Sequence, residues 1–455
     1  MLEDSTAGST ATLASWVAGL SFDALGPAVQ TRIPLHLMDF AGVAAAGKQS
    51  AESSDHARAA AFGATAGAVT GDSACTVVGE VDGLAPDLAA FLNGTYAHSL
   101  DFDDTTIASS LHPGAPVIAA ALPLAETLGT AGSHLITAIA AGYEVACRVG
   151  EALGESPYQR GFHPTAVAGV FGAVSAGAVL LELDAEQVLN ALGTAGSMAA
   201  GSLQCLEDGT WNKRIHPGLA ARNALFSLDL ARCGFRAATA ALEGRKGTLQ
   251  AFSDSPNVAV LTQDLGRTWR LLDTGVKPYP ACRLTHGAID AALVLRPRLD
   301  EQQRDQADIT VSLSPIAVDI VGRDVASKRR PVSVVDGQFS AYFQIAAALL
   351  YGNLGWAVYD HLGSEEINHA IDRIDIIPSP DVEPAGAFLT IGHEQMKVTT
   401  PSGEPGISLD NAMAENKFRA ITSTVWSRSR QDEIIAAIDA LHHTSADELI
   451  PLLRG

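Results

Sequence analysis

Cysteine is scarce in this chain, and its spacing excludes two classes of protein. The count is odd, the residues stand far apart, and no CxxC pair occurs. A disulfide framework needs an even, organised set, and an iron–sulfur dehydratase needs cysteines gathered around one cluster. We therefore expect reduced thiols and a cytoplasmic protein. The five cysteines are Cys75, Cys147, Cys205, Cys233 and Cys282.

Positive charge is also in short supply. The chain has 30 Lys and Arg residues against 51 Asp and Glu residues, which gives a formal net charge of −21. Such a chain repels nucleic acids and anionic membranes, so neither is an expected partner. It repels small anions at long range as well. An anionic substrate would therefore have to be held by a local cluster of cations.

Aromatic residues make up only 6% of the chain, whereas hydrophobic residues make up 47%. That hydrophobic fraction is large enough for a buried core and too large for a disordered chain. A core that is poor in aromatic residues and rich in alanine and glycine favours closely packed helices over a sandwich of strands.

Long apolar segments that would cross a membrane are not expected. Residues 161–181 carry no Asp, Glu, Lys or Arg and approach the length of a span. This stretch contains a His-Pro pair and many small residues, and it lacks flanking aromatic or basic anchors, so it predicts a buried helix. Residues 1–6 are acidic and no clean apolar run follows, so a signal peptide is not expected either.

The pattern of hydrophobic residues predicts a fold that is mainly α with an α+β part. A large all-helical domain is expected from residues 1–266, completed by residues 401–455, and a smaller α+β lid domain, residues 267–400, is inserted in it. A cleft between two domains is a common place for a ligand. The expected helices include 113–128, 134–153, 165–183, 185–206, 217–233, 286–295, 339–351, 416–425, 431–441 and 446–453. The expected strands are 268–272, 309–313, 374–377, 388–391 and 396–400.

A first candidate site is the polar segment 93–105, NGTYAHSLDFDDT. In a helix, His98, Asp101 and Thr105 would share one face, and burial would raise the pKa of Asp101 toward that of a general base. A capping or solvated acidic turn is the alternative, while a calcium loop lacks the required ligand spacing. His112 follows closely and could face the same cleft.

Two further segments place a histidine or cations at the start of an apolar helix. His163 precedes Pro164, and a helix N-terminus lowers the pKa of a nearby histidine, so His163 is expected to be neutral. Lys213 and Arg214 precede another apolar segment and could bind carboxylates. The alternatives are a simple His-Pro helix start and a basic surface loop.

A fourth segment, residues 277–286, combines prolines that fix a loop with three groups that could reach an anion: Lys277, Arg283 and His286. Cys282 lies between them and could be a nucleophile, but no neighbouring triad can be identified from the sequence. An inert thiol is the favoured interpretation.

Together these segments resemble the MmgE/PrpD family, which includes 2-methylcitrate dehydratase, cis-aconitate decarboxylase and iminodisuccinate epimerase. Five matches occur in one order along nearly the whole chain. The resemblance implies a helical domain with an α+β lid, a homodimer, a di- or tricarboxylate substrate, and no cofactor or metal. The matching segments are NGTYAHSLDFDDT (93–105), GYEVACRVG (142–150), GFHPTAVAGVFGA (161–173), EDGTWNKRIHPGLAA (207–221) and KPYPACRLTHGAIDAAL (277–293).

By position, the resemblance matches Asp101, Thr105, His112, His163 and Lys213 to residues of the family's active site. From their chemistry we expect the following roles. Lys213, with Arg214 or Arg283, would hold substrate carboxylates, while His163 and His112 would act as acid and base. Asp101 would orient them or act as base. The full expected catalytic set is Asp101, His112, His163, Lys213 and His286, and the full expected substrate-binding set is His98, Thr105, Arg214, Lys277 and Arg283.

Three departures from the family pattern concern the specific reaction. One extra residue stands between Thr105 and His112, and Cys282 occupies a position where the decarboxylase has histidine. The tyrosine that the family places three residues after Ser340 is Phe343 here, and the nearest tyrosine, Tyr342, is displaced by about 100° around a helix. The missing phenol argues against decarboxylation of cis-aconitate.

The expected chemistry is therefore proton transfer on a carbon next to a carboxylate. Loss of β-hydroxide would make the protein a dehydratase acting on a citrate-like hydroxy tricarboxylate, which is the first expectation. Reprotonation on the opposite face would make it an epimerase of an iminodisuccinate-like dicarboxylate, and loss of carbon dioxide a decarboxylase. A helical binding protein without catalytic activity is the alternative of a different class.

Overall fold

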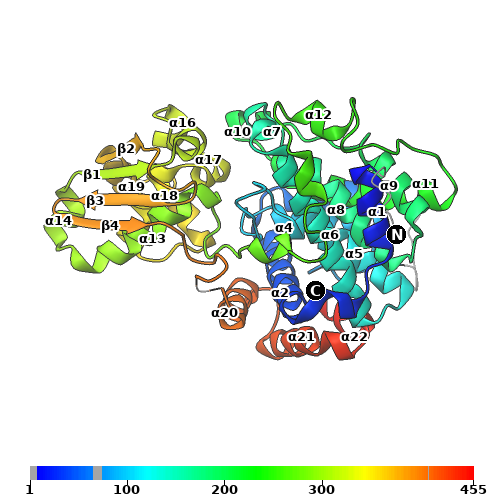
Figure 1. Ribbon diagram of the computed structural model, residues 1–455. Helices are drawn as coiled ribbons and strands as arrows, with labels where there is room; N and C mark the ends of the chain where they lie inside the picture. The colour runs from blue at the N-terminus through cyan, green and yellow to red at the C-terminus, as the bar shows by residue number, and fades with distance from the viewer. Residues whose placement is uncertain (1–7, 65–73, 408) are drawn as a thin grey trace.

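The computed structural model describes residues 8–64, 74–407 and 409–455. The expected lack of a signal peptide concerns residues 1–6, which lie outside the described residues. The chain forms a large helical body and a smaller body that carries a sheet (Figure 1). Each body has its own hydrophobic core. The prediction of a mainly α fold with a small α+β part is confirmed.

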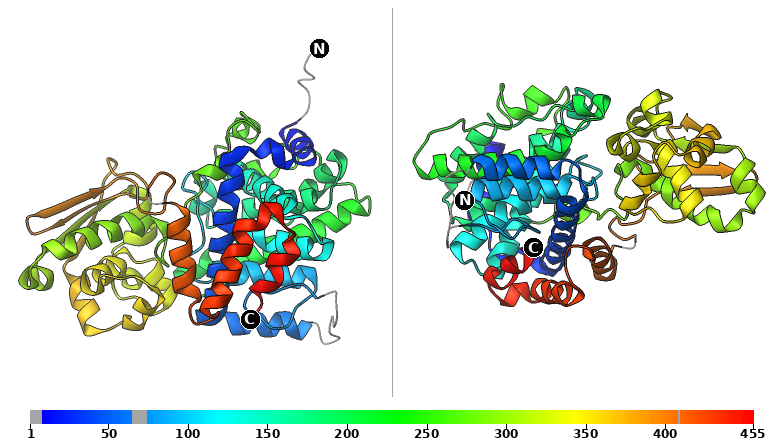
Figure 2. Two further views of the ribbon diagram at one scale, coloured as in Figure 1. Left: turned by 90° about the horizontal axis from the view of Figure 1, so that it is seen from below. Right: turned by 180° about the vertical axis from the view of Figure 1, so that it is seen from behind.

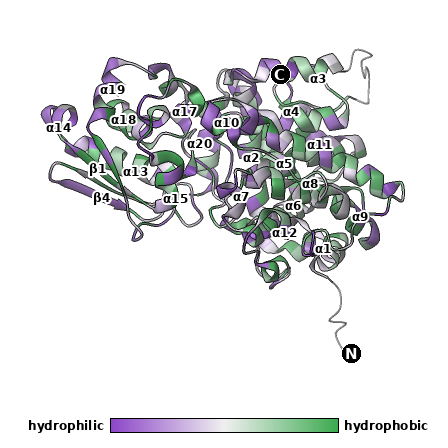
Figure 3. Cartoon of the chain, turned by 90° about the horizontal axis from the view of Figure 1, so that it is seen from above, coloured by the Kyte–Doolittle hydropathy of each residue, from purple (hydrophilic) through white to green (hydrophobic). Residues whose placement is uncertain are grey.

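Small residues allow the central helices of the helical body to approach closely. Every residue of α8 (Pro164–Leu180) is buried, and the apolar residues of this body gather in its interior (Figure 3). A Cβ on Gly142 of α6 (Gly132–Leu153) would lie only 2.8 Å from the carbonyl oxygen of Gly172 in α8. The expected buried helix is confirmed, and none of the described helices is long and apolar enough to span a membrane.

The C-terminal segment returns to the helical body after the sheet. Helix α20 (Asn411–Thr422) packs along α2 (Gly26–Ser50), where Phe418 lies against Gly42. Helix α21 (Arg428–Ala440) continues this layer, so both ends of the described chain belong to one body (Figure 2).

The smaller body contains a four-stranded sheet in the order β2-β1-β3-β4. Strand β1 (Ile309–Leu313) pairs parallel with β2 (Ile374–Pro378) and antiparallel with β3 (Ala387–Ile391), which pairs with β4 (Glu394–Val398). Alternate residues of β1 and β3 are buried. Helix α13 (His286–Leu295) packs on β3 and β4 and against α18 (Ala341–Tyr351).

Three predicted elements are wrong. The expected strand 268–272 is instead a 3₁₀ turn, η3 (Arg270–Asp273), whose Leu271 joins the larger core. The expected helix 185–206 stops at Ala195, because a loop through Gly201, with φ of 120°, precedes α10 (Gln204–Asp208).

The third error concerns the helix expected over 217–233. Helix α11 (Asn212–Arg232) begins five residues earlier and contains Pro217, so Lys213 and Arg214 lie in its first turn rather than in a loop before it. The left-handed turn at Gly209, with φ of 64°, ends the preceding helix.

Candidate active site

The segment that follows α4 (Pro86–His98) forms a turn rather than a continuing helix. The helix ends at His98, and Asp101 has a positive φ of 50°, so the predicted shared helix face is wrong. The turn is fixed from outside: Lys417 donates to the carbonyl oxygen of Phe102 at 2.6 Å. Thr105 pairs with Gly275 through two backbone hydrogen bonds, which places the loop around residue 277 beside the turn.

Lys213 joins the turn to α11. Its Nζ donates to Asp101 Oδ1 at 2.5 Å and to His98 Nε2 at 3.0 Å. Because an ammonium only donates, Nε2 of His98 must accept, and its Nδ1 must donate to Asp103 Oδ2 at 2.7 Å. Burial lowers the pKa of His98 to about 3, outweighing the nearby Asp103 carboxylate. His98 is therefore neutral, with its proton fixed on Nδ1, and it links Lys213 to Asp103.

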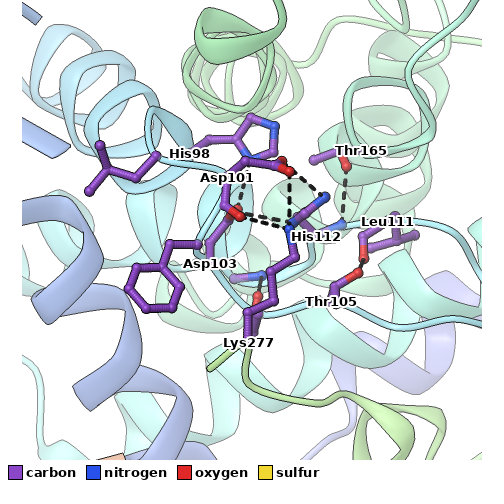
Figure 4. A network of polar contacts seen from close by, with 12 residues as sticks. His98, Asp101, Asp103, Thr105, Leu111, His112, Thr165 and Lys277 are labelled. Atoms are coloured by element: carbon purple, nitrogen blue, oxygen red, sulfur yellow. Dashed lines mark hydrogen bonds and ion pairs between the residues drawn. The ribbon is translucent and has the colours of Figure 1, made fainter. Parts of the chain in front are cut away.

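Two lysines keep Asp101 ionised. Burial by itself raises the pKa of Asp101, but the ammonium groups of Lys213 and Lys277 outweigh burial and hold that pKa well below its ordinary value. Lys277 Nζ donates to the Asp101 carbonyl oxygen at 2.8 Å and lies 3.3 Å from Oδ2 (Figure 4). The expectation that burial raises this pKa toward that of a general base is wrong. The carboxylate instead positions two cations.

Two further histidines lie next to this group. His163 caps the start of α8, and its Nδ1 lies 3.2 Å from Nδ1 of His216 in α11. Burial and the Lys213 ammonium lower the pKa of His163 well below its ordinary value and that of His216 to about 4. The neutral state expected for His163 is thus supported. His112 has Nδ1 at 3.3 Å from Asp103 Oδ1 and Nε2 at 3.9 Å from Asp101 Oδ1.

Five of these groups face one cavity of about 280 Å³ between the two bodies: Asp101, His112, His163, Lys213 and Lys277. The helical body contributes mostly polar groups, and the smaller body contributes mostly apolar ones. The polar side chains that line the cavity include Asp101, Thr105, His112, Tyr158, His163, Lys213, Lys277 and Arg283. The apolar side chains include Ile107, Leu284, Ile316, Ile320 and Phe339.

Three of the predicted residues lie outside this lining. His98 stands behind Lys213 and supports it. Arg214 donates to Glu52 at 2.8 Å and to Ser53 at 3.1 Å, so its charge is paired outside the cavity. His286 lies behind Arg283, with its Nδ1 at 3.0 Å from the Arg283 guanidinium.

Arg283 and Thr105 reach the cavity, but their polar groups already have partners. The Arg283 guanidinium forms an ion pair with Glu404 through two nitrogen atoms, so its charge is balanced. Thr105 donates its hydroxyl to the carbonyl oxygen of Leu111 at 3.2 Å. The oxygen of that hydroxyl remains able to accept a hydrogen bond from a ligand.

The same cluster includes groups that can bind metals. Donor atoms of His98, Asp101, Asp103 and His112 lie within 4.8 Å of one another, as do those of His98, His112 and His163. The ammonium of Lys213 contacts both His98 and Asp101 in this donor set. A bound divalent cation would have to displace that ammonium or share its ligands, so the residues fit a metal poorly. Metal independence remains a prediction.

Comparison with known proteins places the chain among its relatives. The family models described as the MmgE/PrpD N-terminal domain and the MmgE/PrpD C-terminal domain match residues 11–261 and 279–443. The chain belongs to the MmgE/PrpD family. This MmgE/PrpD protein is also 28% identical to a cis-aconitate decarboxylase-like protein of Aspergillus oryzae over 84% of this chain and 85% of the relative.

Two further relatives have similar identity. Cis-aconitate decarboxylase of Aspergillus terreus is 26% identical, with 98% of this chain and 95% of the relative covered. Cis-aconitate decarboxylase of Homo sapiens is 27% identical, with 84% of this chain and 82% of the relative covered.

The family tyrosine position supplies no phenol to the cavity of this MmgE/PrpD protein. Phe343 is fully buried and stacks on Tyr359, with ring centroids 5.6 Å apart. The neighbouring Tyr342 turns away and donates to the carbonyl oxygen of Gly322 at 3.1 Å. Tyr158, from the short helix α7 (Ser156–Gln159), lines the cavity instead.

Sequence reasoning missed three of these residues. Asp103 and His216 lie inside the recognised segments, and their contacts with His98 and His163 are set by a turn and a helix crossing that periodicity does not reveal. Tyr158 precedes His163 by five residues and carries no motif. The described part of the chain offers its hydroxyl no hydrogen-bond partner.

Proposed function

We propose that this MmgE/PrpD protein is a lyase that removes a proton from the carbon next to a carboxylate of a di- or tricarboxylate. One observation carries the proposal: two ammonium groups and the imidazoles of His112 and His163 converge on one cavity. In a chain with a net charge of −21, these cations provide the local site that an anionic substrate requires.

The proposed mechanism begins with a substrate carboxylate bound by Lys213 and Lys277. When the neighbouring carbon loses its proton, negative charge moves onto that carboxylate, and preorganised ammonium groups stabilise it. His163 and His112 line the cavity and are the proposed acid and base. Asp101 fixes both lysines and is too acidic to be the base.

Dehydration is the first candidate reaction. One histidine, as the neutral imidazole, takes the α-proton, and the C–H electron pair forms the carbon–carbon double bond. The second histidine, as the imidazolium, protonates the departing β-hydroxide to give water. The observation that favours dehydration is Phe343, which stands at the family tyrosine position and is buried. Its ring has no hydroxyl, and the loss of that hydroxyl argues against decarboxylation of cis-aconitate.

Decarboxylation is the second candidate, because the relatives named above are cis-aconitate decarboxylases or resemble them. In that reaction the electron pair of the broken C–C bond stays on the substrate, and a histidine then protonates the carbon. Lys213 and Lys277 would again bind the substrate carboxylate, and His163 or His112 would supply the proton.

Turnover of 2-methylcitrate, cis-aconitate and iminodisuccinate, with and without a chelator, tests the proposal. A new conjugated alkene, seen by ultraviolet absorbance, identifies dehydration, and released carbon dioxide identifies decarboxylation. Deuterium exchange without net elimination identifies epimerisation. Failure to convert any acid of a broader di- and tricarboxylate panel contradicts the lyase assignment, and strict dependence on an added metal contradicts the mechanism.

A further inference from the structure

Lys328 is a buried cation without an anion. It lies in the short helix α16 (Ala326–Arg329) of the smaller body, and only 5% of its surface is exposed. Within residues 8–64, 74–407 and 409–455, no carboxylate or hydrogen-bond acceptor contacts its Nζ. Its Nζ lies 5.8 Å from the centroid of the Phe339 ring. A buried, unmatched ammonium is costly, and burial lowers the pKa of Lys328.

The acidic groups closest to Lys328 already have other partners. Glu207 forms an ion pair with Arg323 at 2.8 Å. Asp336 accepts from Ser333 at the start of α17 (Val334–Gln338). Neither carboxylate forms an ion pair with Lys328, so the charge of this lysine is left for a group that does not belong to the described chain.

Phe339 connects Lys328 to the active-site cavity. Lys213 Nζ lies 5.4 Å from the centroid of the same ring. Lys328 lines a second hollow of about 530 Å³, which shares Glu155, Tyr158, Ile316, Ile320 and Phe339 with the active-site cavity. The two hollows therefore adjoin along one wall, with a lysine contacting Phe339 from each.

The charges of the active-site cavity explain why a second site is needed. Lys213 and Lys277 share the single charge of Asp101, and Arg283 is balanced by Glu404. Only one positive charge of these five groups remains in excess, and the exposed Glu155 carboxylate in the lining opposes it. A dicarboxylate brings two negative charges, so a second one would be buried without a partner unless another cation lies within reach.

We propose that Lys328 forms a second anion-binding site, which holds the substrate carboxylate farthest from the reacting carbon. This inference rests on the proposed function and assigns a binding residue to the second carboxylate of its substrate. The substrate carries at least two carboxylates: one binds Lys213 and Lys277, and the other lies beyond Phe339 at Lys328. The chain between them passes the apolar wall formed by Ile316 and Ile320.

Calorimetric binding to the full chain tests the second site with three unreactive acids: butyrate, glutarate and propane-1,2,3-tricarboxylate. In Lys328→Met, the affinity for at least one of the two polycarboxylates falls about tenfold or more, as expected for loss of a charged hydrogen bond, while affinity for butyrate is unchanged. Lys328→Arg retains the charge and keeps most of the polycarboxylate affinity. Lys397→Met removes the charge of an exposed lysine of the same body and serves as the control.

The outcomes separate this inference from the proposed function. If Lys213→Met abolishes binding while Lys328→Met alters neither polycarboxylate affinity, the second site is wrong and the proposed function stands. If the wild-type protein binds none of the three acids, both fail. The melting temperature without ligand reports folding: it should not fall in Lys328→Met, because that change removes a buried unpaired charge.

Discussion

At the scale of the residue, the chemistry of the site depends on protonation states set by burial and by neighbouring charges. Asp101 stays ionised because two ammonium groups flank it, and His98 stays neutral because burial outweighs its contact with Asp103. The types of residue expected from the sequence are present, but their environments reverse one expected role. The Asp101 carboxylate, which the sequence suggested as a base, instead holds the ammonium groups of Lys213 and Lys277 in place.

Tyr158 is expected to contribute to the reaction through its hydroxyl. Burial raises the pKa of Tyr158 well above its ordinary value, so it remains a hydrogen-bond donor facing the cavity. In Tyr158→Phe, kcat/KM should fall by about tenfold, the cost of one hydrogen bond to a charged group, with little change in melting temperature. Tyr351→Phe, at a tyrosine outside the cavity, is the matched control. Equal kcat/KM in both variants would show that the Tyr158 hydroxyl takes no part.

Acid should destabilise the folded protein through its buried histidines. The folded pKa is about 3 for His98 and about 4 for His216, both below the value of about 6.5 in the unfolded chain. The unfolded state therefore binds more protons below about pH 6.5, and the free energy of unfolding falls as the pH drops from there toward 4. Urea unfolding at a series of pH values measures this loss, which should be smaller in His216→Asn. An identical pH dependence in that variant would contradict the account.

At the scale of the element, the site depends on how closely two helices cross. A Cβ on Gly218 of α11 would lie 2.1 Å from the carbonyl oxygen of Phe91 in α4. Helix α4 ends at His98 and α11 begins just before Lys213, so this crossing sets the distance between those two side chains. A change far from any ligand can thus alter the geometry of the site.

Gly218→Ala should separate these helices. We expect a loss of about 1–3 kcal/mol in the free energy of unfolding, as for other overpacked cores, and a fall in kcat/KM. Gly63→Ala provides the control, because nothing lies within 4 Å of its Cβ in α3 (Ser54–Ala64). There, reduced freedom of the unfolded chain should leave stability unchanged or slightly higher. Equal stability of the two variants would contradict the crossing as described.

The elements also show what the sequence could and could not predict. Alternating apolar residues revealed β1 and β3, and the segment around His98 and Asp101 contained the right residue types. The left-handed backbone at Asp101 was not predictable, because a non-glycine residue adopts it only when its surroundings require it. Lys328 carries no motif, and its importance comes only from its burial beside Phe339.

At the scale of the whole molecule, the family resemblance predicts a homodimer, and α11 offers a surface for it. Phe226 is 57% exposed in a groove that it shares with Leu128 and Leu181. The groove also contains Arg222 and Asp229, so it carries both signs of charge. A twofold interface brings a surface against its own copy, and charges of both signs can then pair across it.

Phe226→Asp should therefore convert the dimer to a monomer, because it places a charge in the apolar centre of the contact. Size-exclusion chromatography with light scattering measures the mass. Val332→Asp, at an 87% exposed valine of the smaller body, should leave the dimer intact. A monomeric wild-type protein, or a dimer unaffected by Phe226→Asp, would exclude this surface as the interface.

The most direct test of the account is exchange of substrate carbon-bound hydrogen with solvent deuterium, followed by NMR for each acid that the wild-type protein converts. We expect exchange next to a carboxylate in the wild-type protein. In Lys213→Met, with the fold intact by circular dichroism, the rate should fall by about two orders of magnitude or more, as for loss of a donor that stabilises the transition state. An unchanged rate in Lys213→Met would contradict the claim that this cavity stabilises a deprotonated acid.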